Sequence, residues 1–156
     1  MAEINVEFIN PFLMAASSIM KDMCQLTTTV GKPYVKTTEF DESCVIILIG
    51  VTGEMRGQVI IALSLEVACD IASKMIMMPI TEMNELSMSA ISELGNMILG
   101  NAATILSTKG IGIDITPPTL CRGTVSITTA YARNICIPLI YEEGKCIELD
   151  IALKQD

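Results

Sequence analysis

The sequence contains no histidine and no tryptophan, and only 4% of its residues are aromatic. Without histidine, the chain has no Ser–His or Cys–His nucleophile pair and no imidazole ligand for a metal ion. Charged residues are also few, at 18%, while hydrophobic residues reach 51% and include 11 methionines. This composition excludes disorder as the main state and predicts a core of aliphatic and methionine side chains.

Basic residues are scarce as well, since 10 Lys and Arg stand against 18 Asp and Glu, for a net charge of −8. Nucleic-acid phosphates are neutralised by Lys and Arg, so nucleic acid is not an expected partner. The longest apolar run, at residues 44–49, is far short of the ~20 residues that a membrane-spanning helix needs. The N-terminus has no basic segment ahead of an apolar one. We therefore expect a cytoplasmic protein without membrane insertion, folded as one domain over residues 1–156.

Six cysteines are present, and none belongs to a C-x-x-C pair. A zinc site or a thioredoxin-type redox site is therefore not expected. Apolar residues surround four of the six, namely Cys44, Cys69, Cys121 and Cys136. This setting favours small core side chains in a reducing compartment.

Capping residues and hydrophobic periodicity predict three helices, at about 5–25, 64–78 and 84–107, with Asn5, Ser64 and Asn84 as their caps. Alternating or β-branched runs predict strands, and these lie at 34–40, 44–51, 58–63, 111–115, 120–128, 133–141 and 145–153. Helices and strands come in groups rather than one by one. This order predicts an α+β fold with a largely antiparallel sheet and helices packed on it.

The third predicted helix has two unlike faces. One wide apolar sector should face the core, and it holds Leu86, Ala90, Ile91, Leu94, Met97, Ile98, Ala102, Ile105 and Leu106, with Asn101 as a polar exception. The remaining stripe holds Ser89, Ser92, Glu93, Asn96, Gly100, Ala103 and Ser107. Solvated helix faces usually carry more long charged side chains. The stripe therefore either packs against a neighbouring helix or subunit, or forms a functional surface from which Glu93 and Asn96 project on the same side.

The segment Ser89-Ala90-Ile91-Ser92-Glu93-Leu94-Gly95-Asn96-Met97, followed by Gly100, resembles the E-x-x-N signature of the CheC/CheX/FliY phosphatases of bacterial chemotaxis. Two further segments agree with that family, Ile49-Gly50-Val51-Thr52-Gly53 and Asp114-Ile115-Thr116-Pro117-Pro118-Thr119. The order of the predicted elements agrees over essentially the whole chain. A second E-x-x-N site is missing, because Glu66 is followed at the Asn position by Cys69. With its single E-x-x-N site, the chain is similar to CheX.

The resemblance implies a phosphatase that hydrolyses the aspartyl phosphate of a CheY-type response regulator. Asn96 would orient the attacking water, because a carboxamide both donates and accepts hydrogen bonds. Glu93 would pair with a lysine of the regulator, and Ser89, Ser92 and Gly100 would contact that partner. Mg²⁺ would arrive on the regulator, so the chain would need no cofactor of its own. The resemblance also implies a homodimer.

Two other functions remain open on the residues alone. The first is a non-catalytic docking or flagellar-switch-like module with the same fold, against which the intact Glu93 and Asn96 argue. The second is an oligomerisation domain whose stripe is a subunit interface. For the homodimer, the β-rich segments 124–129 and 146–153 should place at least one poorly protected strand at a sheet edge.

Overall fold

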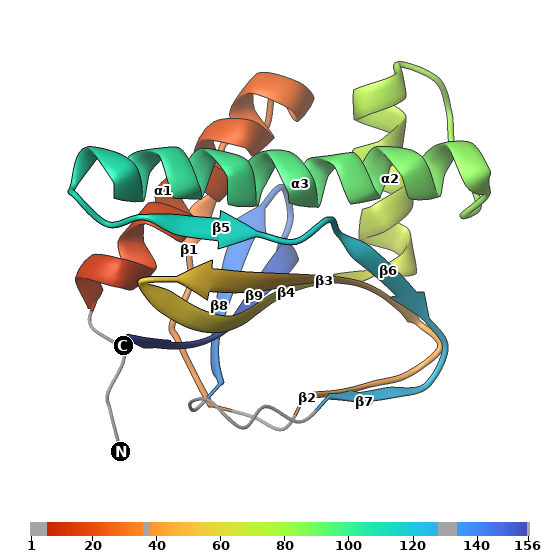
Figure 1. Cartoon of the computed structure of the whole chain (residues 1–156). Helices are drawn as coiled ribbons and strands as arrows, with labels where there is room; N and C mark the ends of the chain where they lie inside the picture. The colour runs from red at the N-terminus through yellow and green to blue at the C-terminus, as the bar shows by residue number, and fades with distance from the viewer. Residues whose placement is uncertain (1–5, 36–37, 128–133, 156) are drawn as a thin grey trace.

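In a computed structural model, which describes residues 6–35, 38–127 and 134–155, three helices lie on one face of an antiparallel sheet (Figure 1). This arrangement confirms the predicted α+β fold. The elements, in chain order, are α1 (Val6–Cys24), β1 (Thr29–Val30), β2 (Thr38–Phe40), β3 (Cys44–Gly53), β4 (Met55–Ser64), α2 (Leu65–Ile76), α3 (Glu85–Thr108), β5 (Ile113–Ile115), β6 (Thr119–Arg122), β7 (Val125–Ile127), β8 (Ile135–Tyr141) and β9 (Lys145–Gln155).

The main sheet has seven strands in the order β1-β8-β9-β4-β3-β5, and β6 also pairs with β3. Both β5 and β6 run along the same side of β3, opposite Val51–Gly53 and Val45–Leu48 respectively. The Pro117-Pro118 step lies between them, as a stiff turn should. The backbone N–H of Gly50 donates to the Thr116 hydroxyl at 2.8 Å. The two motif segments outside α3 are thus paired with each other.

The main core lies between the sheet and the helices. Alternate residues of the central strands point into it, including Val45, Ile47, Ile49, Val59, Ile61, Leu149 and Ile151. A smaller cluster on the other face joins Phe40, Ile46, Ile60 and Ala62. That cluster lies towards the separate two-stranded sheet of β2 and β7. The helices therefore cover one face of the main sheet and a strand pair covers part of the other.

The helix predictions hold closely. Ser64 and Asn84 cap α2 and α3 through their side chains, while the proposed cap Asn5 lies outside the described residues. Helix α2 ends at Ile76 rather than at 78, because Met77 adopts a left-handed conformation. Pro11 lies inside α1 and is buried. Within the described ranges, no helix is both long and apolar enough to cross a membrane.

Several strand predictions need correction. Among the described residues of the run 34–40, Thr38–Phe40 form a strand, while Tyr34 makes a single bridge to Cys136. The run 120–128 divides into β6 and β7, since the chain turns at Gly123 with φ of +92°. The sheet-edge prediction is confirmed for one of its two segments. The segment 146–153 lies in β9, between β8 and β4, and is interior to the main sheet, whereas Val125–Ile127 form β7, which is an edge strand of the two-stranded sheet.

The cysteine prediction is correct in part. None of the six described cysteines forms a disulfide, and Cys24 and Cys136 are the two that are buried. Cys44 and Cys121 are half-buried beside the smaller cluster, and Cys69 is half-buried on α2. Burial raises the pKa of the Cys24 thiol to about 11, even though the nearby Lys74 ammonium acts in the opposite direction. Cys24 is therefore a protonated core residue at neutral pH.

Candidate functional site

The start of α3 is fixed by a reciprocal cap. The Asn84 side-chain oxygen accepts from the backbone N–H of Ser87 at 2.9 Å, and the Ser87 hydroxyl accepts from the backbone N–H of Asn84 at 2.7 Å. Ser87 is buried, and its hydroxyl also donates to the Glu82 carbonyl at 3.1 Å. These bonds satisfy N–H groups that a helix start would otherwise leave unpaired. They set the position from which the stripe begins.

The inner face of α3 lies unusually close to β3 at Gly95. A Cβ atom placed on Gly95 would stand 2.9 Å from the Ile47 Cγ2 atom, closer than side chains tolerate. Gly95 is buried, as are its neighbours Leu94 and Ile98. The glycine between Glu93 and Asn96 is therefore explained by packing. It presses this turn of the helix against the sheet and turns the two polar side chains outward.

The outer stripe of α3 carries the predicted site residues. Ser89 and Glu93 are exposed, and Ser92 and Asn96 are half-buried. A Cβ on Gly100 would meet nothing within 4 Å, so the chain's own packing does not require this glycine. Among the described residues, the Glu93 carboxylate and the Asn96 amide make no hydrogen bond or ion pair with each other or with any neighbour. Both side chains are available to a partner.

Leu86 departs from the sequence-based prediction. It was expected in the apolar sector, yet its side chain is 53% exposed. The core positions of α3 are Ile91, Leu94, Ile98, Leu99, Ala102 and Leu106, together with Ser87 and Gly95. The buried sector is thus rotated away from Leu86, which lies two turns before Glu93 on the exposed side. Asn101 is half-buried, and nothing in the structure explains why an amide stands there.

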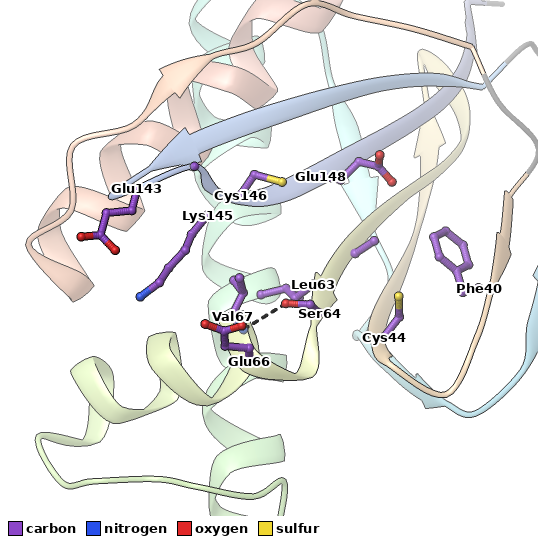
Figure 2. A pocket seen from close by; sticks show the side chains of 12 residues that line it. Phe40, Cys44, Leu63, Ser64, Glu66, Val67, Glu143, Lys145, Cys146 and Glu148 are labelled. Atoms are coloured by element: carbon purple, nitrogen blue, oxygen red, sulfur yellow. Dashed lines mark hydrogen bonds between the residues drawn. The ribbon is translucent and has the colours of Figure 1, made fainter.

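The stripe is a convex helix face rather than the wall of a cavity. Glu93 and Asn96 line neither of two surface cavities that lie among the described residues. The larger, of about 500 Å³, lies where α2 and β9 begin, near Lys145, Ser64 and Glu148 (Figure 2). Small-molecule sites are usually concave. A convex site with two polar side chains is instead suited to entering a cavity on another macromolecule.

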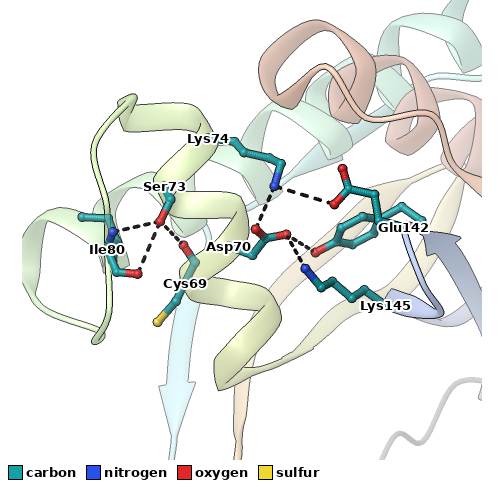
Figure 3. A network of polar contacts seen from close by, with 8 residues as sticks. Cys69, Asp70, Ser73, Lys74, Ile80, Glu142 and Lys145 are labelled. Carbon is teal, nitrogen blue, oxygen red and sulfur yellow. Dashed lines mark hydrogen bonds and ion pairs between the residues drawn. The ribbon is translucent and has the colours of Figure 1, made fainter.

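Helix α2, which packs beside α3, is anchored by a polar network (Figure 3). Lys74 donates to Asp70 at 2.7 Å, the Tyr141 hydroxyl donates to the same carboxylate at 2.8 Å, and the Lys145 ammonium lies 3.6 Å away. Burial by itself would raise the pKa of Asp70, but these hydrogen bonds and charges outweigh it and lower the pKa. The network joins α2 to the β8–β9 hairpin.

A group of potential ligand atoms lies on the sheet face opposite the helices. The Cys136 sulfur and carboxylate oxygens of Glu148 and Asp150 all lie within 4.8 Å of one another, and Asp150 is fully buried. Burial, together with the adjacent Asp150, raises the pKa of Glu148 to about 8. Tyr34 donates to Glu148. A proton retained by the carboxyl pair thus allows the two acids to lie side by side, with Asp150 fully buried and Glu148 half-buried. The sequence analysis did not identify this pair. The signal that could have shown it is the alternation of Glu148 and Asp150 in a β-rich run.

The chemistry open to the stripe follows from its two polar side chains. The Asn96 amide offers two N–H donors and one carbonyl acceptor, which suits it to holding a water molecule but not to removing its proton. The Glu93 carboxylate offers a negative charge to a cation on a partner. Without a base or a nucleophile, this surface can therefore do two things. It can orient a water molecule, and it can align a partner through an ion pair.

Comparison with known proteins supports this description. The sequence profile described as "Chemotaxis phosphatase CheX" matches residues 45–139. The chain is 29% identical over 153 residues to the CheY-P phosphatase CheX of Thermotoga maritima, covering 97% of this chain and 98% of the relative. The CheX of a CheX–CheY–BeF3–Mg²⁺ complex from Borrelia burgdorferi superposes with a TM-score of 0.82 at 31% identity, covering 97% of this chain and all of that one. A CheC-like protein from Shewanella sp. PV-4 gives a TM-score of 0.86 at 27% identity, covering 97% and 99%.

Proposed function

Since the chain belongs to the chemotaxis phosphatase CheX family, we propose that its substrate is the aspartyl phosphate of a CheY-type response regulator. The observation that carries this proposal is the outward, unpartnered placement of Glu93 and Asn96 on a rigidly packed helix. The relatives named CheY-P phosphatase and the CheX–CheY complex support the choice of partner. A convex site also fits a substrate that brings its own phosphate-binding cavity.

Asn96 enters that cavity and holds the attacking water in line with the phosphorus atom. Aspartyl phosphate is an activated acyl phosphate, and phosphoryl transfer passes through a loose transition state. Positioning of the nucleophile then supplies much of the catalysis, and no general base is needed. Fixing a water in this way lowers a barrier by several kcal/mol. The free donors and acceptor of Asn96 meet this requirement.

Glu93 fixes the relative orientation of the two proteins by pairing with a lysine of the regulator. The carboxylate lies one turn before Asn96, so that it reaches a group beside the phosphate while the amide reaches the water. Such a pair is desolvated when the proteins associate and is therefore charge-assisted. Ser89, Ser92 and Gly100 allow the regulator to approach the helix backbone. Mg²⁺ belongs to the regulator, and the Borrelia complex holds the ion together with CheY and BeF3.

Residues 1–156 act as one CheX-like domain that works in the cytoplasm, where response regulators are found. We also propose that two chains form a homodimer in which both stripes stay open. The edge of the main sheet at β1 supports this arrangement. Val30 exposes an apolar side chain on this edge strand, and such an edge tends to pair with another chain.

The proposal is tested by following phosphate loss from phosphorylated receiver domains with and without the protein. We expect the wild-type chain to accelerate loss from at least one CheY-type receiver in a catalytic, substoichiometric manner. A protein that binds the phosphorylated receiver tightly but leaves its lifetime unchanged would instead be a docking module. A protein that neither binds nor dephosphorylates any receiver would contradict both assignments.

A further inference from the structure

Two residues of the connection between α2 and α3, and one in the first turn of α3, expose large apolar side chains. Met77 is 89% exposed, Met78 is 54% exposed and Leu86 is 53% exposed. Single exposed apolar residues are ordinary on protein surfaces. Three around one connection, which leads into the helix that carries Glu93 and Asn96 (Figure 1), are a feature to explain.

This connection is held in place rather than loosely attached. The Ser73 hydroxyl accepts from the backbone N–H of Ile80 at 2.9 Å and donates to the Cys69 carbonyl at 2.7 Å, so the chain folds back on the end of α2 (Figure 3). Ile80 and Met83 point inward and pack against the main core. The outward direction of Met77, Met78 and Leu86 is therefore fixed by the fold.

Met77 lowers the stability of the free chain through its backbone conformation. It follows α2 with φ of +64° and ψ of +35°, and its backbone N–H donates to the Ser73 carbonyl at 2.9 Å. Glycine or asparagine usually occupies this left-handed position, because other side chains strain the backbone by about 1 kcal/mol or more. The nearly full exposure of the side chain means that no burial offsets this strain. Burial against a partner would supply the missing compensation.

Leu86 lies within reach of a partner centred on Asn96. The two residues are ten positions apart on α3, which is about 15 Å along a helix axis. A standard protein interface covers about 800 Å² on each partner, a patch of about 16 Å radius. Leu86 also lies seven residues before Glu93 and so projects from nearly the same side of the helix. Glu82 and Glu85, both exposed, flank it and favour a partner with basic residues around an apolar patch.

We propose that Leu86, Met77 and Met78 form an apolar contact for the receiver domain of the regulator, continuous with the Glu93–Asn96 stripe. This inference rests on the proposed function. The contact adds affinity and partner choice rather than chemistry. Methionine side chains are flexible and polarizable, so they pack against receiver surfaces that differ in detail.

The test uses a CheY-type receiver domain whose phosphorylated form is a substrate of the wild-type chain. The same receiver is loaded with beryllofluoride and Mg²⁺, and its binding to each variant is measured. We expect Leu86→Gln to raise the dissociation constant by about fivefold or more, and Leu86→Met to recover most of that loss. Met77→Asn should raise the thermal midpoint by about 2 °C, because backbone strain is relieved, while it weakens binding about threefold. A more stable protein that binds less well cannot be explained by misfolding.

Val35→Thr is the matched control, since Val35 is 64% exposed and lies between β1 and β2, away from α3. Its affinity for the receiver should equal that of the wild type. Receiver affinities within twofold of wild type for both Leu86→Gln and Met77→Asn would overturn the inference and leave the proposed function intact. A wild-type chain that acts on no receiver would overturn both. If Leu86→Gln instead dissociates a dimer without changing receiver affinity, the patch binds a second copy and the inference is wrong.

Discussion

The Glu93 carboxylate is available to a partner protein. It is exposed and makes no ion pair among the described residues, so replacing it should leave the fold unaffected. Glu93→Lys places a positive charge where a regulator lysine is expected. We predict a half-saturation concentration of phosphorylated regulator raised by about tenfold or more, with a smaller effect on the maximal rate. Titration of activity against phosphorylated regulator measures both quantities. An unchanged half-saturation point would show that Glu93 does not face a cation.

The carboxyl pair of Glu148 and Asp150 makes stability depend on pH. Burial and the adjacent Asp150 raise the pKa of Glu148 to about 8 in the folded chain, against 4.5 as the ordinary value. The folded state thus holds a proton that the unfolded state releases between these values. The contribution of this pair to the free energy of unfolding is fully present below pH 4.5 and declines as the pH rises to 8. Glu148→Gln should flatten this decline, because an amide mimics the protonated acid. Thermal midpoints from pH 5 to 8.5 measure the slopes, and equal slopes for both proteins would contradict this assignment.

At the residue scale, polarity and helical period were sufficient to place Glu93 and Asn96 outside the core. The same period misplaced Leu86, because periodicity gives the direction of a side chain and not whether another element covers it. At the first turns of α3, no neighbour covers that direction. The Glu148–Asp150 pair was missed for a related reason. Two acids on one side of a strand usually indicate solvent, and only the neighbouring strands and Tyr34 place this pair in the interior.

Helix α3 carries two glycines whose substitution should act in opposite directions. Gly95→Ala introduces a Cβ 2.9 Å from Ile47, and such overpacking costs about 1–3 kcal/mol. Gly100→Ala meets nothing within 4 Å and should stabilise the helix by up to about 1 kcal/mol. Urea unfolding of the two variants measures this difference.

The variants Gly95→Ala and Gly100→Ala also distinguish a role in packing from a role in contacting the regulator. Gly100→Ala should raise the half-saturation concentration of regulator despite its greater stability, because the added methyl group lies on the docking stripe. If affinity and activity stay at wild-type values, Gly100 is not in contact with the regulator. If Gly95→Ala is as stable as the wild type, the close approach to Ile47 does not position α3.

At the element scale, local signals were reliable and pairing signals were not. Ser64 and Asn84 were identifiable as caps because their hydrogen bonds span only three residues. The run 34–40 has strand-like composition, but strands form only where a partner lies alongside. Tyr34 meets β8 at a single bridge, whereas Thr38–Phe40 pairs with β7 in another sheet. The two-residue β1 is too short to leave a periodic pattern.

For the whole molecule, the position of β9 changes the expected dimer interface. Residues 146–153 lie inside the sheet, so they cannot pair with a second chain. The main sheet instead ends at β1, where the Val30 side chain is exposed, and β7 is an edge of the two-stranded sheet. Strand order depends on contacts between distant segments, and composition along the chain does not encode it. The fold class, by contrast, followed from the grouping of helices and strands.

We predict a solution mass near twice 16.8 kDa at micromolar concentration, with pairing through the β1 edge. Val30→Lys places a charge on that edge and should shift the mass toward the monomer, as seen by sedimentation or light scattering. Asn96→Ala should leave the mass unchanged. A monomeric wild type would reject the dimer. A dimer dissociated by substitutions in the α3 stripe would show that the stripe is a subunit interface.

The most direct measurement compares the wild type with Asn96→Ala at saturating phosphorylated receiver, with binding of the beryllofluoride-loaded receiver measured in parallel. Because Asn96 is half-buried on the stripe and outside the core positions of α3, the variant should stay within about 0.5 kcal/mol of wild-type stability. We predict receiver binding within a few-fold of wild type and a maximal dephosphorylation rate reduced at least about 100-fold. A variant that binds the receiver and retains near wild-type turnover would show that Asn96 does not position the attacking water.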